Sequence, residues 1–257
     1  MADMTGQVAL VTGGVRGIGF AISDRLAARG VEVAAGYSRD KEAAERFRER
    51  HPGSSVHRGN IGSVDDCERV IQEVLDTHGR LDILVNNAGI TADRTVRKMT
   101  PQEWDRVVQV NLSGAFYLSR AILQHMLDRG SGRIINISSI IGESGNIGQA
   151  NYAAAKAGLF GLTMSLAQET GRKGITVNSV APGYISTDMV AAVPKEAMQK
   201  VITGIPLAAS ASPTRSPASS SSSPTPTPAS SPDRSIRSTA ASTCEAKIIT
   251  SRGVPWR

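Results

Sequence analysis

The first 180 residues alternate between short apolar runs and longer stretches with helical periodicity. The apolar runs are brief and rich in β-branched residues, as expected for strands buried on both faces of a sheet. We expect strands at 7–12, 31–36, 54–59, 81–85, 134–138 and 175–180, and helices at 20–29, 41–50, 64–78, 104–126 and 151–171. Thr100, Pro101 and Glu103 match an N-cap, N1 and N3 and predict a helix start. The regular alternation predicts one α/β domain, a doubly wound parallel sheet of the Rossmann type.

A glycine-rich turn joins the first strand to the first helix. Residues 13–19 read Gly-Gly-Val-Arg-Gly-Ile-Gly, which allows the backbone and the helix N-terminus to approach a pyrophosphate. The expected contacts are Gly13, Arg16, Gly17, Ile18 and Gly19. The spacing differs from G-x-G-x-x-G, so an ordinary turn that binds nothing remains the alternative.

The end of the second strand indicates which dinucleotide is bound. A site for NAD usually places a carboxylate there, for the ribose 2′-hydroxyl. This strand ends in Gly-Tyr-Ser38-Arg39 instead. Ser38, Arg39 and Arg16 can neutralise a 2′-phosphate, which favours NADPH, unless both arginines are only solvated.

Tyr152 and Lys156 are four residues apart in the last predicted helix and therefore share one face. The lysine charge is expected to lower the tyrosine pKa and make the phenol a usable proton donor. Ser139, thirteen residues before the tyrosine, can bond the same substrate oxygen; Ser138 is the neighbouring alternative. Such Tyr/Lys pairs are common on surfaces, so the pair alone is weak evidence.

Composition narrows the class of protein further. The formal charge of the 257 residues is +6, but residues 208–257 supply +4 of it, so nucleic-acid binding is not expected. No run is long and apolar enough for a membrane span, and no secretory signal precedes the first strand. The two cysteines suggest neither a disulfide framework nor a metal site, which fits the cytoplasm.

Residues 1–207 resemble the short-chain dehydrogenase/reductase family. The likeness rests on the glycine turn, Asn86-Asn-Ala-Gly89, Asn111, Ser139, Tyr152-x-x-x-Lys156 and Pro182-Gly183. Residues 148–158 and 181–189 are similar to the bacterial acetoacetyl-CoA and 3-oxoacyl-carrier-protein reductases, which serve polyhydroxybutyrate and fatty acid biosynthesis. The family forms tetramers through the helices that hold Asn111 and Tyr152. A homotetramer is thus expected for an intact member and is doubtful for this chain.

The resemblance implies further site residues. Asn111 would bend its helix and hold a proton-relay water, completing a catalytic set with Ser139, Tyr152 and Lys156. The other cofactor contacts implied are Asn60, Ile61, Asn87, Ala88, Gly89, Tyr152, Lys156, Pro182, Gly183, Ile185 and Thr187. The substrate candidates are Asp93, Ser139, Asn146, Gln149 and Tyr184. Arg97 and Lys98 either meet a phosphate of the acyl carrier or form a solvated charge run.

The activity implied is NADPH-dependent reduction of a 3-oxoacyl thioester, on CoA or on an acyl carrier protein. Two alternatives remain. One is a reductase of the same family that acts on a sugar, a steroid or a quinone. The other is an inactive dinucleotide-binding product of a damaged gene.

The likeness ends at Leu207, and residues 208–257 form a separate tail. Residues 208–243 hold 13 Ser and 6 Pro, a composition typical of disorder. The family would have a helix, the last strand and a Gly-Gly turn here, and these are expected to be lost, leaving the sixth strand uncovered. A one-base loss after codon 207 accounts for the change. Read back into the other frame, 208–242 can encode that helix, strand and turn in order.

Overall fold

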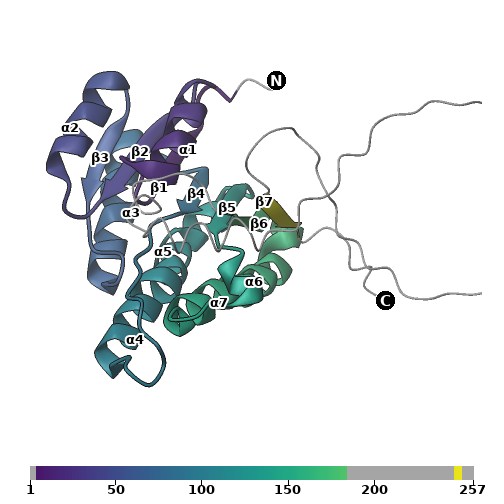
Figure 1. Ribbon diagram of the computed structural model, residues 1–257. Helices are drawn as coiled ribbons and strands as arrows, with labels where there is room; N and C mark the ends of the chain where they lie inside the picture. The colour runs from purple at the N-terminus through teal and green to yellow at the C-terminus, as the bar shows by residue number, and fades with distance from the viewer. Residues whose placement is uncertain (1–3, 184–245, 251–257) are drawn as a thin grey trace, which may run out of the picture.

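The parallel sheet is built from six short strands whose side chains are mostly buried. The computed structural model describes residues 4–183 and 246–250. The parallel strands are β1 (Val8–Val11), β2 (Glu32–Tyr37), β3 (Ser55–Arg58), β4 (Ile83–Asn86), β5 (Gly132–Ile137) and β6 (Ile175–Pro182). They lie in the order β3-β2-β1-β4-β5-β6, so the chain reverses its direction of travel between β1 and β4 (Figure 1). This is the doubly wound order, and the predicted fold class is confirmed.

Helices connect the strands and cover the sheet. They are α1 (Gly17–Ala27), α2 (Lys41–Arg50), α3 (Val64–His78), α4 (Pro101–Val108), α5 (Gly114–Asp128), α6 (Ile141–Ser144) and α7 (Ala150–Thr170). A 3-10 turn, η2 (Gly171–Lys173), precedes β6. The predicted start of α4 is confirmed, because Thr100 and Glu103 form a reciprocal capping box with Pro101 in the first turn.

Two apolar clusters lie on the two faces of the sheet. On one face, Leu10, Leu84 and Ile134 pack with side chains of α3, α5 and α7. On the other face, Val11 and Val85 pack with side chains of α1 and α2. Alternate strand residues therefore enter opposite cores, which explains why the strands read as continuous apolar runs.

Three elements depart from the expectations. The helix predicted over 104–126 contains a π turn, η1 (Gln109–Ser113), between α4 and α5. Residues 141–144, which lie between the predicted strand 134–138 and the predicted helix 151–171, form α6. The edge of β6 is not uncovered as expected, since β7 (Ala246–Thr250) pairs with it antiparallel, with Val180 opposite Ile248. The reason is that Ala-Lys-Ile-Ile-Thr, unlike the Ser/Pro stretch before it, suits a strand.

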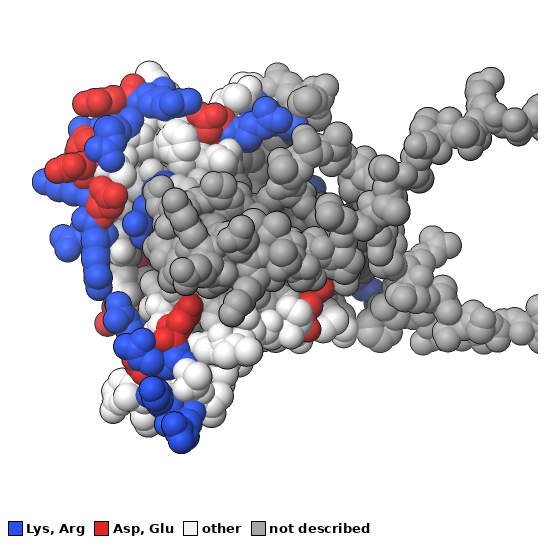
Figure 2. All heavy atoms as spheres, viewed as in Figure 1, with Lys and Arg blue, Asp and Glu red and all other residues white. Residues whose placement is uncertain are grey.

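Basic and acidic side chains are interspersed on the visible face. Figure 2 shows Lys and Arg along the side formed by α2 and α4, with Asp and Glu among them. On α2, Arg48 lies 2.8 Å from Glu45 and Arg50 lies 3.1 Å from Asp24. Within 4–183 and 246–250, no helix is long and apolar enough to cross a membrane. The remaining predictions for the tail fall outside these ranges.

Candidate active site

The predicted site residues gather at one edge of the sheet. Each of the six parallel strands ends at this edge, and each is followed directly by residues predicted to bind cofactor or substrate. In an open parallel sheet, ligands bind outside the carboxyl ends, where the strand order reverses. That reversal lies between β1, which is followed by the glycine turn, and β4, which is followed by Asn87, Ala88 and Gly89.

The glycine turn leaves no room for side chains where it meets the turn after β4. A Cβ on Gly19 would lie 2.1 Å from the Gly13 carbonyl oxygen and 2.6 Å from the Asn87 amide nitrogen. Gly13 and Gly17 have φ values of +63° and +54°, which favour glycine. The turn opens into the N-terminus of α1, with Arg16 as the exposed N-cap residue. The backbone thus forms a cradle that fits a dinucleotide phosphate.

Thr12 fastens the turn after β4 to the end of β1. Its hydroxyl accepts from the backbone N–H groups of Asn87 and Ala88, both at 3.0 Å, and the Asn87 amide donates to the Thr12 carbonyl at 2.8 Å. In the sequence, Thr12 is only the last residue of the predicted strand at 7–12. Its burial, at 2% exposed, could not be read from the sequence.

Basic side chains lie around the end of β2. Ser38 and Arg39 directly follow this strand, and Arg16 comes from the glycine turn. The structure adds Arg58, whose Nε donates to the Ser38 carbonyl at 3.4 Å. Sequence reasoning missed it because the pairing of β2 with β3 was needed to place it there. After β3, the Asn60 side chain accepts from the Gly62 N–H at 3.1 Å, and Ile61 packs against the α3 and α5 side of the core.

Asn111 lies in the π turn and holds the segment after β4. Its side-chain oxygen accepts from the Ile90 N–H at 2.8 Å, and its amide donates to the Ile90 carbonyl at 2.9 Å. A Cβ on Gly89 would lie 3.3 Å from the Asn111 oxygen and 3.6 Å from the Lys156 Nζ. Asn111 and Lys156 therefore flank the same small space beside Gly89.

Tyr152 and Lys156 project from the first turns of α7. The Lys156 Nζ is buried, donates to the Ile137 carbonyl at 2.7 Å, and lies 5.7 Å from the centroid of the Tyr152 ring. Ser139 is buried, and its hydroxyl accepts from the Ile141 N–H at 3.2 Å. The Ser138 hydroxyl instead donates to the Lys156 carbonyl at 2.7 Å. Of the two serines, only Ser139 is directed at Tyr152.

The pKa values correct one expectation. Burial raises the pKa of Tyr152, a hydrogen bond with the Ser139 side chain opposes this, and the Asp93 carboxylate adds to it. The net direction is therefore opposite to the expected one, and the Lys156 ammonium donates to the Ile137 carbonyl rather than to the phenol. Burial lowers the pKa of Lys156 itself to about 8. The phenol therefore keeps its proton at neutral pH.

Three of the substrate candidates form one hydrogen-bonded chain on the surface beside the candidate site. The Asn146 amide donates to the Gln149 side-chain oxygen at 2.8 Å, and the Gln149 amide donates to the Asp93 carboxylate at 2.9 Å. Arg97 and Lys98 are in the turn that follows Asp93. Pro182 ends β6 at the same edge, and Gly183 follows it. Tyr184, Ile185 and Thr187 lie outside the described residues.

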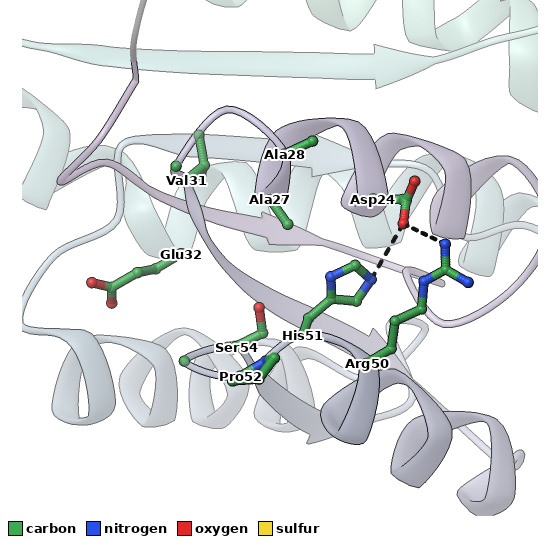
Figure 3. Close-up of a pocket in the computed structure, with 11 residues that line it drawn as sticks. Asp24, Ala27, Ala28, Val31, Glu32, Arg50, His51, Pro52 and Ser54 are labelled. Atoms are coloured by element: carbon green, nitrogen blue, oxygen red, sulfur yellow. Dashed lines mark hydrogen bonds and ion pairs between the residues drawn. The ribbon is translucent and has the colours of Figure 1, made fainter.

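A hollow of about 420 Å³ lies at the opposite edge, between the ends of α1 and α2 and the starts of β2 and β3. Figure 3 shows the Asp24 carboxylate there, in contact with Arg50 at 3.1 Å and His51 at 3.5 Å. The Arg50 guanidinium also covers the Phe20 ring at 5.3 Å. None of the predicted site residues lines this hollow. It does not belong to the active site.

The buried cysteine is a packing residue. Burial raises the pKa of the Cys67 thiol to about 12, and its Sγ donates to the Ile61 carbonyl at 3.3 Å. Within the described part of the chain, no three His, Cys, Asp or Glu side chains are grouped so that they could hold a metal ion.

Comparisons with known proteins agree with this geometry. The family model described as short chain dehydrogenase matches residues 7–198. The acetoacetyl-CoA reductase of Shinella zoogloeoides is 48% identical over 208 residues, which cover 80% of this chain and 86% of the relative. The acetoacetyl-CoA reductase of Rhizobium meliloti (strain 1021) is 49% identical over the same shares. The 3-oxoacyl-[acyl-carrier-protein] reductase FabG of Staphylococcus aureus (strain Mu50) is 47% identical over 204 residues, with 78% and 83% covered. The chain therefore belongs to the short-chain dehydrogenase family.

Proposed function

We propose that this chain catalyses the NADPH-dependent reduction of a 3-oxoacyl thioester to the 3-hydroxyacyl thioester. The observation that carries the proposal is the placement of a protonated, partly buried Tyr152 beside Ser139 and a buried Lys156. These three residues lie at the same edge of the sheet as the glycine turn, whose backbone forms the phosphate cradle. Relatives named for acetoacetyl-CoA and for 3-oxoacyl-[acyl-carrier-protein] support the substrate class.

Tyr152 acts as the general acid. A reduced nicotinamide supplies hydride to the ketone carbon when it is bound. The ketone oxygen takes its proton from the Tyr152 hydroxyl, and the Ser139 hydroxyl holds the same oxygen in place. Because burial raises the pKa of Tyr152, the proton remains available until the oxygen gains negative charge.

Lys156 and Asn111 act on the Tyr152 phenolate that remains after the proton has been transferred. The buried Lys156 ammonium stabilises the anion through its charge, and it lies close enough to the small space at Gly89 to contact a ribose hydroxyl. Asn111, on the other side of that space, is positioned to hold a water that returns a proton to Tyr152. Catalysis then ends with a neutral tyrosine.

NADPH is the proposed cofactor, because Ser38 and the arginines 16, 39 and 58 surround the end of β2. A guanidinium binds a phosphate through paired charged hydrogen bonds, whereas an NAD site would need an acceptor for the 2′-hydroxyl. We assign the activity to residues 1–207 and the protein to the cytoplasm. We favour CoA as the acyl carrier, on the basis of the relatives named acetoacetyl-CoA reductase.

The test is NADPH oxidation by the 257-residue chain, and by the same chain with its frame restored after codon 207. Acetoacetyl-CoA, longer 3-oxoacyl-CoA thioesters and their carrier-protein forms are compared with a sugar, a steroid and a quinone. We expect thioesters to be reduced fastest, and NADPH to be preferred over NADH.

The variant Tyr152→Phe removes the acid and is expected to lower kcat by about 10²–10⁴-fold. Tyr117→Phe makes the same chemical change on α5 and should leave kcat within about twofold. Failure of both chains on every thioester, or full activity of Tyr152→Phe, would refute the proposal.

A further inference from the structure

A fully buried asparagine directly precedes the proposed proton donor. Asn151 is 0% exposed. Its amide donates to the Ala92 carbonyl at 3.1 Å and to the Glu103 carbonyl at 3.4 Å, and its side-chain oxygen accepts from the Tyr152 N–H at 2.7 Å. One side chain therefore joins three segments.

These bonds fasten the start of α7 to the wall of the active site. Ala92 lies in the segment after β4, which Asn111 holds at Ile90. Beyond it, the Arg94 N–H donates to the Gly148 carbonyl at 2.8 Å. Glu103 lies in α4, so Asn151 also ties α7 to this helix.

The next turn of α7 is fastened at Lys156. The Ser138 hydroxyl donates to the Lys156 carbonyl at 2.7 Å, and the Lys156 Nζ donates to the Ile137 carbonyl. Tyr152 lies between these two attachments. Its backbone therefore has little freedom to move along or around the helix axis.

We propose that Asn151 is a positioning residue, which fixes the depth and direction of Tyr152 for proton transfer. The inference rests on the proposed function. Proton transfer needs donor and acceptor atoms about 2.6–3.2 Å apart, and a misplacement of about 1 Å can cost roughly 10²-fold in rate. Without Asn151, the Ala92 and Glu103 carbonyls lose a donor, and the first turn of α7 loses its attachment.

Asn151→Ala is compared with Asn136→Ala in the 257-residue chain. Asn136 is equally buried, and its amide donates to Thr163 at 2.9 Å, eleven residues after Tyr152 on α7 and roughly 16 Å along the helix. It also accepts from the Asn86 amide at 2.9 Å, so both variants remove a buried amide network. Asn151→Ala should lower kcat about 10–100-fold, with KM and the cofactor Kd within about threefold. Asn136→Ala should lose comparable thermal stability and keep kcat within about threefold.

Asn151→Asp adds a readout that loss of structure would not produce. An aspartate keeps the oxygen that accepts from the Tyr152 N–H, and it can donate to the Ala92 carbonyl only when protonated. Its kcat relative to the wild type should therefore rise about tenfold or more between pH 8 and about pH 5.5. A ratio that does not change with pH, or equal kcat values for Asn151→Ala and Asn136→Ala, would overturn the inference.

A substrate-free measurement separates this inference from the proposed function. The ionisation of Tyr152 is followed by ultraviolet difference titration of each variant against its Tyr152→Phe counterpart. Asn151→Ala should shift the Tyr152 titration towards the ordinary tyrosine value, and Asn136→Ala should not. If no thioester is reduced, the proposed function fails, while this shift still supports positioning. If the titration does not move, the positioning role fails even in an active reductase.

Discussion

Lys156 is a buried cation whose side chain has one hydrogen-bond acceptor among the residues that the structure describes, the Ile137 carbonyl at 2.7 Å. Burial lowers its pKa to about 8, which shows that the folded chain disfavours the charged form. A buried charge without a full set of partners destabilises a protein. We therefore attribute its presence beside Tyr152 to the catalytic role proposed above rather than to stability.

We predict that Lys156→Met abolishes turnover and stabilises the fold by about 1–3 kcal/mol at pH 7. The folded pKa is below the unfolded value, so the contribution of Lys156 to wild-type stability is most favourable above pH 10.5 and decreases as the pH falls to about 8. This dependence should vanish in Lys156→Met. Urea unfolding at several pH values measures both effects, with the exposed Lys173→Met as the control. A less stable Lys156→Met would contradict the prediction.

The sequence predicted which residues meet at the active site better than it predicted their electrostatics. Helical spacing placed Tyr152 near Lys156, and the strand ends placed Ser139 beside them. The direction of the tyrosine pKa was wrong, because it depends on burial and on where the ammonium points. Asn151 was missed because its partners, Ala92 and Glu103, are distant in sequence.

At the scale of elements, apolar runs predicted all six parallel strands, since buried strands need apolar residues on both faces. The π turn at 109–113 was not predicted, because it preserves the apolar character of an α-helix while changing the hydrogen bonds. The strand at 246–250 was also missed. Its register depends on the edge of β6, which the local sequence does not reveal.

The outer strand β3 carries a chain of titratable groups away from the active site. The Ser55 hydroxyl contacts the Nε2 atoms of His57 at 2.7 Å and His78 at 2.8 Å. The Nδ1 atoms of these histidines contact Glu73 at 3.1 Å and Glu32 at 2.9 Å.

We predict that the hydrogen-bonded chain around Ser55 makes the free energy of unfolding decrease at acid pH. Burial lowers the pKa of His57, with the charges of His78 and Arg69 acting in the same direction and Glu73 opposing them. A lowered folded pKa means that the stabilisation is present above about pH 6.5 and is lost as the pH falls below it, by at most about 1.4 kcal/mol per pH unit for one proton.

His57→Gln should reduce this dependence between about pH 7.5 and 5.5, as measured by urea midpoints. It should leave the kcat of thioester reduction unchanged, because β3 contributes to the reaction only through cofactor contacts at its other end. An unchanged pH slope in the variant would show that His57 is not the group responsible.

At the scale of the whole molecule, the two ends of the sheet are built differently. β3 forms one edge as a parallel strand, whereas β7, from the end of the chain, forms the other as an antiparallel strand. β7 pairs with the β6 backbone groups that would otherwise invite edge-to-edge association. β7 adds five residues at the edge of β6, whereas the family pattern would place a helix and a parallel strand there.

The reading frame after codon 207 decides whether the chain carries the family's C-terminal helix and strand. The family model ends at residue 198, ahead of the Ser/Pro-rich stretch, and the relatives are matched over 86% of their length or less. If one base was lost, restoring it returns a helix whose apolar face contributes about 25 cal/mol per Å² that it buries. Burial of several such side chains contributes roughly 5–10 kcal/mol to the free energy of unfolding, which is comparable to the net stability of a domain.

We therefore expect the frame-restored chain to be more soluble, to unfold at higher temperature and to form a tetramer with higher kcat than the 257-residue chain. Sequencing the gene, then comparing the two proteins by calorimetry, light scattering and NADPH oxidation, tests each part. Ending the present chain after residue 245 is the control, since it removes β7 and should lower solubility through the exposed β6 edge. A 257-residue chain that already forms a stable, fully active tetramer would show that β7 replaces the family's C-terminal elements.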